Sequence, residues 1–398
     1  MKRIVWALIF LLLATPAWCA KKITVGQLED LLRSLQQEKK SDADVATALK
    51  QVELTEELTR GAMNSLVSYV PGPLSTEQIY VLEARSADLI PPETDLPKTP
   101  APDEAAQKAM LGKAALYVKT GYDQLPALTA TRTTLRFQDN VETVSGGSGL
   151  QGGAQEVVTG AGFSNPATFV HYINSTQAQI ASIHGAEKLP AEKDKTRWGA
   201  NGMIALQAPD PSLGVIFREA QASGTLHWLR WELINGKSAA VYSFKVDSRK
   251  ARLPISVCCF PKINQAGIAT FYTATTAQAM GGGSGGGGVN GNFQTTTEWN
   301  KFSATVPYHG ELFVDPDLGV VVRMIVQAEL KPSDVVHQVD TRVDYSPVKV
   351  GDRLLVVPVK TYVISEVVPK GDSGAGTYTT RCTLFTSELK GYGLADAN

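Results

Sequence analysis

The sequence has few of the residues that carry metal or redox chemistry. Its 398 residues include four cysteines and five histidines, and the histidines are widely spaced: His171, His184, His227, His309 and His337. Neither H-E-x-x-H nor C-x-x-C, two spacings at which neighbouring side chains share a zinc ion, occurs in the chain. We therefore expect no metal site and no cofactor.

An excess of either charge is also absent. The formal net charge is −1, and residues of both signs are interspersed along the chain. A nucleic-acid backbone is bound by clustered positive charge. We therefore expect no nucleic-acid partner.

Long apolar runs are almost absent, and the one that exists lies at the start. Lys2 and Arg3 precede an apolar run over 4–14, and mostly small residues follow to Ala20, which is the pattern of a secretory signal peptide. We expect residues 1–20 to be cleaved, after Cys19 or Ala20. Lipidation of Cys19 is the less favoured alternative, because bulky Trp18 stands where a lipoprotein signal peptidase requires a small residue.

No later run reaches the roughly 20 apolar residues of a membrane-spanning helix. The mature chain is therefore expected to lack a transmembrane segment and to be periplasmic or extracellular.

Proline and glycine indicate the domain organisation. Five prolines in 91–102 predict a stiff connector. We expect a helical domain over 21–126 that includes this connector, an antiparallel β domain over 127–390, and a C-terminal tail over 391–398. The Gly-rich tracts 145–153 and 281–291 are predicted to be loops of the β domain, either lids or plain surface loops.

Helix signals dominate the region before the connector. Three hydroxyl residues stand three positions ahead of an acid or amide, as in a capping box: Thr24 with Gln27, Ser41 with Asp44, and Ser75 with Gln78. Leucines recur at helical spacing through 28–35 and 54–66. A further helix is predicted over 103–123, so this region should be a small helical assembly with an internal leucine core.

After residue 131 the hydrophobic period changes to two. In 320–330 and 337–345 one face is predicted to be apolar, with Val322, Met324 and Val326 together, and the other face wet. The stretch 314–320 predicts a hairpin turn, with a second copy over 209–215 before another strand, and Asn235-Gly236 predicts a type I′ turn. The strand containing Trp228 and Trp231 is expected to be central. The fold class is therefore α+β, an N-terminal helical region followed by a large curved antiparallel sheet.

Motifs for catalysis are weak. Gly282-Gly283-Ser284-Gly285-Gly286 fits G-x-S-x-G by chance, because no strand precedes it and no helix follows. His309, Glu311 and Asp315 should share one strand face and form the most suggestive polar cluster, either catalytic or a solvated strand edge. We assign no catalytic residue beyond these three candidates.

The cysteines that remain after signal removal are Cys258, Cys259 and Cys382. Cys258 and Cys259 are adjacent in a predicted strand and point to opposite faces, so only one of them can readily reach Cys382. A disulfide from Cys382 to either one and three buried thiols are both compatible with the sequence.

The segments "SGTLHWLRWE", "HGELFVDPDLGVVVRM" and "TRVDYSPVKVGDRLLVVPVKTYVIS" carry a resemblance. They resemble uncharacterised families of secreted bacterial proteins and, more distantly, the half-barrels of outer-membrane lipoprotein sorting and carrier proteins. The resemblance covers about 215–365 and implies a curved sheet whose apolar face either closes on a helix or holds an acyl chain. The residues that it implies for lining such a groove are Trp228, Phe244, Val322, Met324 and Val326.

Three hypotheses about function follow. The first is a non-enzymatic envelope protein that binds a lipid or another apolar ligand. The second is a structural or protein-interaction component of the cell envelope, with a protein partner. The third is a secreted hydrolase built on His309, Glu311 and Asp315.

Overall fold

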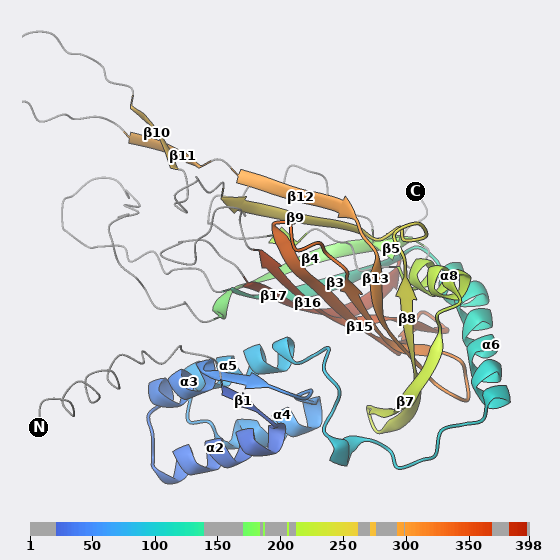
Figure 1. Cartoon of the computed structure of the whole chain (residues 1–398), viewed down its shortest axis with the longest axis horizontal. Coiled ribbons are helices and arrows are strands. Elements are labelled where there is room, and N and C mark those ends of the chain that lie inside the picture. Colours follow the sequence, from blue (N-terminus) through green and yellow to red (C-terminus); the bar gives the residue numbers. More distant parts are fainter. Residues whose placement is uncertain are drawn as a thin grey trace, which may run out of the picture. The chain divides into compact units, whose positions relative to one another are not determined.

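The computed structural model describes residues 21–138, 170–183, 186–187, 205–206, 212–261, 271–275, 293–297, 299–367 and 382–395. The chain divides into two compact units at Pro92/Glu93. Each is described by itself (Figure 1).

The first unit is a small helical assembly with a two-stranded parallel sheet. Its elements are β1 (Lys21–Ile23), α2 (Val25–Gln37), α3 (Asp42–Lys50), β2 (Val52–Leu54), α4 (Arg60–Leu66), η2 (Val67–Tyr69) and α5 (Pro73–Arg85), and β1 pairs with β2. Its core is formed largely by leucines, including Leu28, Leu32, Leu49, Leu58, Leu66 and Leu82. The predicted internal leucine core is therefore confirmed.

Two of the three predicted helix starts are confirmed. Thr24 forms a complete capping box with Gln27, and the Ser41 side chain accepts from the backbone N–H of Asp44. The third prediction is wrong, because α5 begins at Pro73 and Ser75 is buried inside it. The Ser75 hydroxyl donates to the carboxylate of Asp42 at 2.5 Å, so the hydroxyl joins two helices and does not cap one.

The second unit is built around one antiparallel sheet of ten strands. Their order is β5-β4-β3-β17-β16-β15-β14-β13-β8-β7. The bounds are β3 (Leu128–Gln138), β4 (His171–Ile183), β5 (Ala186–Glu187), β7 (His227–Ile234), β8 (Lys237–Val246), β13 (Tyr308–Val314), β14 (Val321–Ala328), β15 (Val336–Val350), β16 (Arg353–Val367) and β17 (Cys382–Leu394). The predicted α+β fold with a large antiparallel sheet is thus confirmed.

Smaller elements complete this unit. They are η3 (Glu93–Asp95), α6 (Glu104–Thr120), η4 (Tyr122–Gln124), β6 (Ala205–Leu206), α8 (Leu213–Ser223), β9 (Pro254–Pro261), β10 (Phe271–Thr275), β11 (Phe293–Thr297) and β12 (Trp299–Thr305). Strands β12, β9 and β6 form a three-stranded sheet, and β10 pairs with β11. Helices α6 and α8 lie side by side next to the large sheet, where α6 contacts β13 and α8 contacts β8 (Figure 1).

Helix α6 belongs to this second unit, which differs from the expected domain boundary at residue 126. Met110, Ala114 and Val118 of α6 are buried in the same hydrophobic cluster as the large sheet. The division falls near the start of the connector, between Pro92 and Glu93, because the helix packs on the sheet that follows it in sequence.

The hairpin turns follow the sequence closely. Asn235 and Gly236 both have positive φ, 51° and 78°, as a type I′ turn requires. In the β13–β14 turn, Gly319 has φ +70°. Lys113 of α6 donates from Nζ to the backbone oxygens of Pro316 and Asp317, both at 3.1 Å. The β13–β14 turn therefore holds helix α6.

Three other expectations are wrong. The second copy of the turn motif is followed by helix α8, which begins at Leu213 after the N-cap residue Ser212. Strand β7, with Trp228 and Trp231, is the terminal strand of the ten and not a central one. The predicted tail from residue 391 is strand up to Leu394, because β17 continues pairing with β3 to Leu128.

Some expectations fall outside the described residues. These are the signal peptide at 1–20, Cys19, and the Gly-rich tracts 145–153 and 281–291. In the part of the chain that the structure describes, no helix is long and apolar enough to cross a membrane.

Candidate functional site

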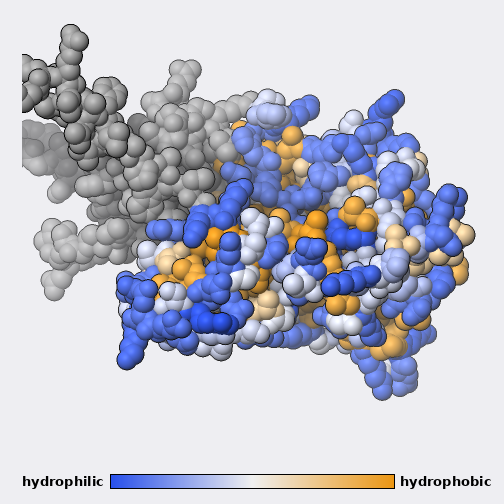
Figure 2. Space-filling model, turned by 60° about the horizontal axis from the view of Figure 1, so that its bottom comes forward, coloured by the Kyte–Doolittle hydropathy of each residue, from blue (hydrophilic) through white to orange (hydrophobic). Residues whose placement is uncertain are grey.

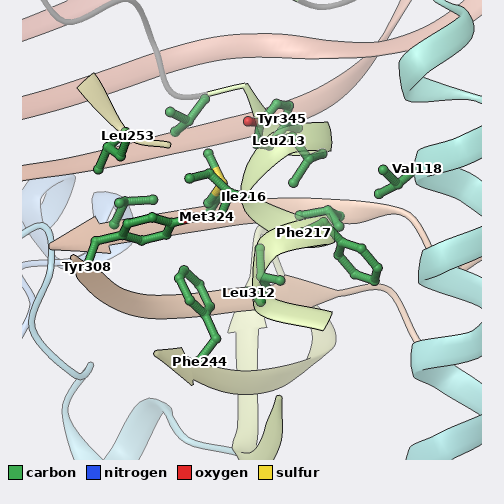
Figure 3. Packing of buried hydrophobic residues seen from close by; sticks show 14 of the residues in the cluster. Val118, Leu213, Ile216, Phe217, Phe244, Leu253, Tyr308, Leu312, Met324 and Tyr345 are labelled. Carbon is green, nitrogen blue, oxygen red and sulfur yellow. The ribbon is translucent and has the colours of Figure 1, made fainter. Parts of the chain in front are cut away.

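The candidate site is the apolar face of the large sheet, where it meets α8. Phe244 of β8, Leu312 of β13 and Met324 of β14 are buried against Ile216 and Phe217 of α8 (Figure 3). The same cluster continues onto β15 and β16 through Val343 and Val357. Helix α6 and strands β9 and β12 also contribute to it. The apolar face is therefore covered by other parts of its own chain.

Four of the five residues implied for a groove lie on this face. Phe244, Met324 and Val326 are buried in the cluster, and Trp228 packs against it partly buried. The rings of Trp228 and Tyr242 meet edge to face at 5.8 Å. The Trp231 indole, next to Trp228 at 4.9 Å, donates to the backbone oxygen of Pro100 in the connector.

Val322 lies on the opposite face, which corrects the expectation that it sits beside Met324. The pairing of β13 with β14 shifts between Phe313 and Val314, so Val322 is the extra residue of a β-bulge. It packs with Phe313 and Ile325 in a smaller cluster. Strict alternation along the strand fails at this one position.

Helix α8 is fixed to the sheet by an apolar stripe and a few polar contacts. Its buried residues are Leu213, Gly214, Ile216, Phe217 and Ala220. The Glu219 carboxylate accepts from the Tyr308 hydroxyl at 2.7 Å and from the backbone N–H of Arg252 at 3.0 Å. Burial, followed by the contact with Glu219, raises the pKa of the Tyr308 phenol above its ordinary value. At neutral pH the hydroxyl therefore keeps its proton and donates it to Glu219.

The opposite face of the sheet carries a chain of alternating charges, which we call the charge ladder. It runs Glu311–Arg230–Glu232–Arg323–Asp344–Arg342, across strands β13, β7, β14 and β15. Arg230 meets Glu311 through two parallel hydrogen bonds at 3.0 and 2.7 Å, the paired geometry that favours guanidinium over ammonium. The ladder contains three positive and three negative groups, so it is neutral.

This face was expected to be wet, but much of the ladder is buried. Glu232, Arg323 and Arg342 are 1%, 8% and 7% exposed. The guanidinium groups of Arg230 and Arg323 also lie 5.9 and 5.4 Å from the centre of the Phe313 ring. The alternating sequence pattern does not distinguish such paired charges from solvated ones.

Asp344 holds the densest part of the ladder. Its Oδ1 accepts from Nε of Arg323 at 2.7 Å and from Nε of Arg342 at 3.0 Å. Burial by itself would raise the pKa of this carboxyl, but the two guanidinium groups outweigh burial and hold the pKa well below its ordinary value. The carboxyl group is therefore ionised throughout the neutral range.

His309, Glu311 and Asp315 do not converge. His309 is near Glu329, with Nδ1 to Oε1 at 3.3 Å, and Glu311 binds Arg230. Asp315 caps its own turn by accepting from the backbone N–H groups of Asp317 and Leu318, both at 2.9 Å. Each of the three therefore has a separate structural partner.

No group of three or more metal-ligating side chains occurs among the residues that the structure describes. Cys258 and Cys259 lie in β9, and Cys382 starts β17, half-buried. The disulfide pairing of these residues stays a prediction.

On the surface face drawn in Figure 2, hydrophobic residues are interspersed with hydrophilic ones.

The contact between Glu219 and Tyr308 could not be found from the sequence. Glu219 lies in helix α8, which was not predicted, and Tyr308 lies in a strand 89 residues further along the chain.

Comparison with protein-family models, with curated proteins and with solved structures found no match to this chain.

Proposed function

We propose that the chain is a secreted or periplasmic, non-enzymatic protein that binds the apolar part of a lipid, or a similar ligand, on the sheet face beneath α8. The observation that carries this proposal is the apolar face that runs from β8 to β16 and is covered at Phe244, Leu312 and Met324 by an 11-residue helix. Ligand entry requires α8 to move away from these three residues.

The attachment of α8 supports a role as a lid. A helix of 11 residues has little stability of its own in water, so its apolar stripe and its polar anchors keep it in place. Displacing it would expose apolar side chains of the sheet, and an acyl chain could cover them in its place. The Tyr308–Glu219 hydrogen bond is an anchor that can be removed by deleting one hydroxyl group.

A protein-interaction role is the second candidate, and it rests on the free side of β7. Among the described strands β7 pairs only with β8. Two leucines of this strand, Leu229 and Leu233, are 45% and 44% exposed. Edge strands with apolar side chains are common sites for pairing with another chain. The hydrolase hypothesis has no comparable support, because its three residues have separate partners.

The test is native mass spectrometry of the mature protein purified from a periplasm, with a time course of lipid uptake. We expect a lipid adduct on the wild type. Tyr308→Phe removes one anchor of α8, worth about 1 kcal/mol, and should speed uptake about five-fold. Tyr242→Phe is the matched control, because its hydroxyl donates to Gln107 of α6 and not to α8.

A mass free of adduct that does not change after incubation with membrane lipids would contradict the carrier proposal. It would favour the edge of β7 as the functional surface, to be tested by the oligomeric state and by capture of an extended peptide on that edge.

A further inference from the structure

Three buried polar side chains lie side by side on the large sheet. Gln138 of β3 faces Thr383 of β17, and Thr383 faces Ser365 of β16. They are 2%, 2% and 0% exposed. Gln138 Nε2, Thr383 Oγ1 and Ser365 Oγ have no hydrogen-bond partner among the described residues. We call these three residues the polar row.

Such a row is unusual, because buried polar groups in folded proteins nearly always have hydrogen-bond partners. Leaving one donor or acceptor unsatisfied costs free energy, and here three are unsatisfied on adjacent strands. Groups of this kind take hydrogen bonds from ordered water or from a bound ligand. The polar row therefore points to a ligand site.

The polar row lies on the same face as the proposed acyl site. Ser365 faces Val339 of β15, which belongs to the main hydrophobic cluster with Met324. Val339 and Val343 are four residues apart in β15 and therefore point to the same face of the sheet. Val343 pairs with Met324 on β14. One sheet face is thus apolar toward β8 and polar toward β3.

Positive charge accompanies the polar row. Arg136 is two residues before Gln138 in β3, on the same face, with its guanidinium 5.7 Å from the ring centre of Phe385. The residues that share this face on β3, β17 and β16 include no carboxylate, because Glu388 and Glu366 alternate onto the other side. Burial, with Arg132 nearby, lowers the pKa of Arg136 to about 9. A bound anion would favour its charged form.

We propose that the polar row, together with Arg136, binds the anionic head of an amphiphile whose acyl part lies on the apolar half of the same face. This head-group proposal rests on the proposed function. It assigns the ligand to the chemical class of the glycerophospholipids. Ester and phosphate oxygens can accept from the amide of Gln138 and from the hydroxyls of Thr383 and Ser365. A guanidinium group is well suited to pair with a phosphate.

The experiment compares three probes on the full mature protein by isothermal titration calorimetry: dioctanoyl phosphatidylglycerol, neutral dioctanoylglycerol and sn-glycerol 3-phosphate. The variants are Thr383→Val and Ser365→Ala, which remove a hydroxyl with little change in volume. Thr386→Val is the control, since Thr386 is buried on the same strand but faces the other side. Thr383→Ser should keep the affinity of the wild type.

We expect the wild type to bind the anionic glyceride at least about ten-fold more tightly than the neutral one, and each hydroxyl deletion to reduce that affinity about ten-fold. The ligand-free variants should melt at or above the wild-type temperature, because a buried unsatisfied group has been removed. A lower melting temperature would show that the hydroxyls are satisfied within the fold, and would overturn the proposal.

The probes separate this proposal from the one on which it rests. If the two glycerides bind equally and the variants change nothing, the head site is overturned while the acyl site stands. If neither glyceride binds, the proposed function fails with it. If glycerol phosphate binds as tightly as the phospholipid, the ligand is a free phosphate ester and the amphiphile is overturned.

Discussion

Gly319 of the β13–β14 turn lies against the backbone of Lys113 in helix α6. A Cβ atom added to Gly319 would stand 2.5 Å from Cβ and 2.6 Å from the carbonyl carbon of Lys113. The glycine also has φ +70°, a conformation that other residues rarely adopt. Two independent constraints thus require glycine where the hairpin meets the helix.

We expect Gly319→Ala to destabilise the second unit by at least about 2 kcal/mol, from backbone strain and from displacement of α6. Gly351→Ala is the control, because Gly351 has φ +59° and open space around it, so only the strain of about 1 kcal/mol applies. Urea unfolding followed by tryptophan fluorescence measures this unit alone, since every tryptophan after residue 20 lies beyond Glu93. Equal losses for the two variants would show that the contact with Lys113 contributes nothing.

Glu232 is the central acid of the charge ladder, between Arg230 and Arg323. Glu232→Gln keeps the shape of the side chain but removes the negative charge that two buried guanidinium groups share. We expect the free energy of unfolding to fall by about 3 kcal/mol. The control is Glu329→Gln, just past the end of β14, where the pairs with Lys245 and His309 are open to solvent and worth less than about 1 kcal/mol. A loss no larger than that of the control would mean that the ladder is solvated.

We expect Asp344 to contribute to the loss of folding stability at acidic pH. Its pKa in the folded protein is below the ordinary value near 3.8, so the folded state binds its proton less readily than the unfolded state. The stabilisation is present above that ordinary value and is lost as the pH falls through the folded pKa. We expect Asp344→Asn to lose stability at pH 7 and to show a flatter decline below pH 4 than the wild type. Parallel curves for the two proteins in that range would contradict this assignment.

The sequence was sufficient for the features that depend on local pattern. The Asn235-Gly236 turn, the caps at Thr24 and Ser41, and the change from helical to strand period after residue 131 all depend on neighbouring residues. The position of β7 could not be predicted, because its tryptophans are only partly buried against the main hydrophobic cluster and its leucines Leu229 and Leu233 stay exposed, so no second flanking strand among those described covers it. Helix α8 was missed because a turn motif precedes both it and strand β14.

The candidate site was only partly predictable for the same reason. Four groove residues lie on the expected face, but the bulge at Val322 has no signature in the alternation of 320–330. The polar row joins residues 138, 365 and 383, which only the pairing of β3, β17 and β16 brings together. Both the bulge and the polar row depend on how strands distant in sequence pair with one another, which composition does not reveal.

The bulge can be tested by comparing two truncations on one strand. Met324 is fully buried beneath α8, whereas Val322 is half-buried in the smaller cluster on the other face. Met324→Ala should cost about 2 to 5 kcal/mol, because it removes a large side chain from the main core. Val322→Ala should cost roughly 1 kcal/mol or less, since it removes less apolar area from a site that is already open to water.

The two variants should also differ in ligand uptake. Met324→Ala changes the surface on which an acyl chain would lie, so lipid uptake measured by native mass spectrometry should change. Val322→Ala should leave uptake at the wild-type level, because its side chain faces away from α8. Equal effects of the two substitutions on stability and uptake would place both residues on one face, as simple alternation predicts, and would contradict the bulge.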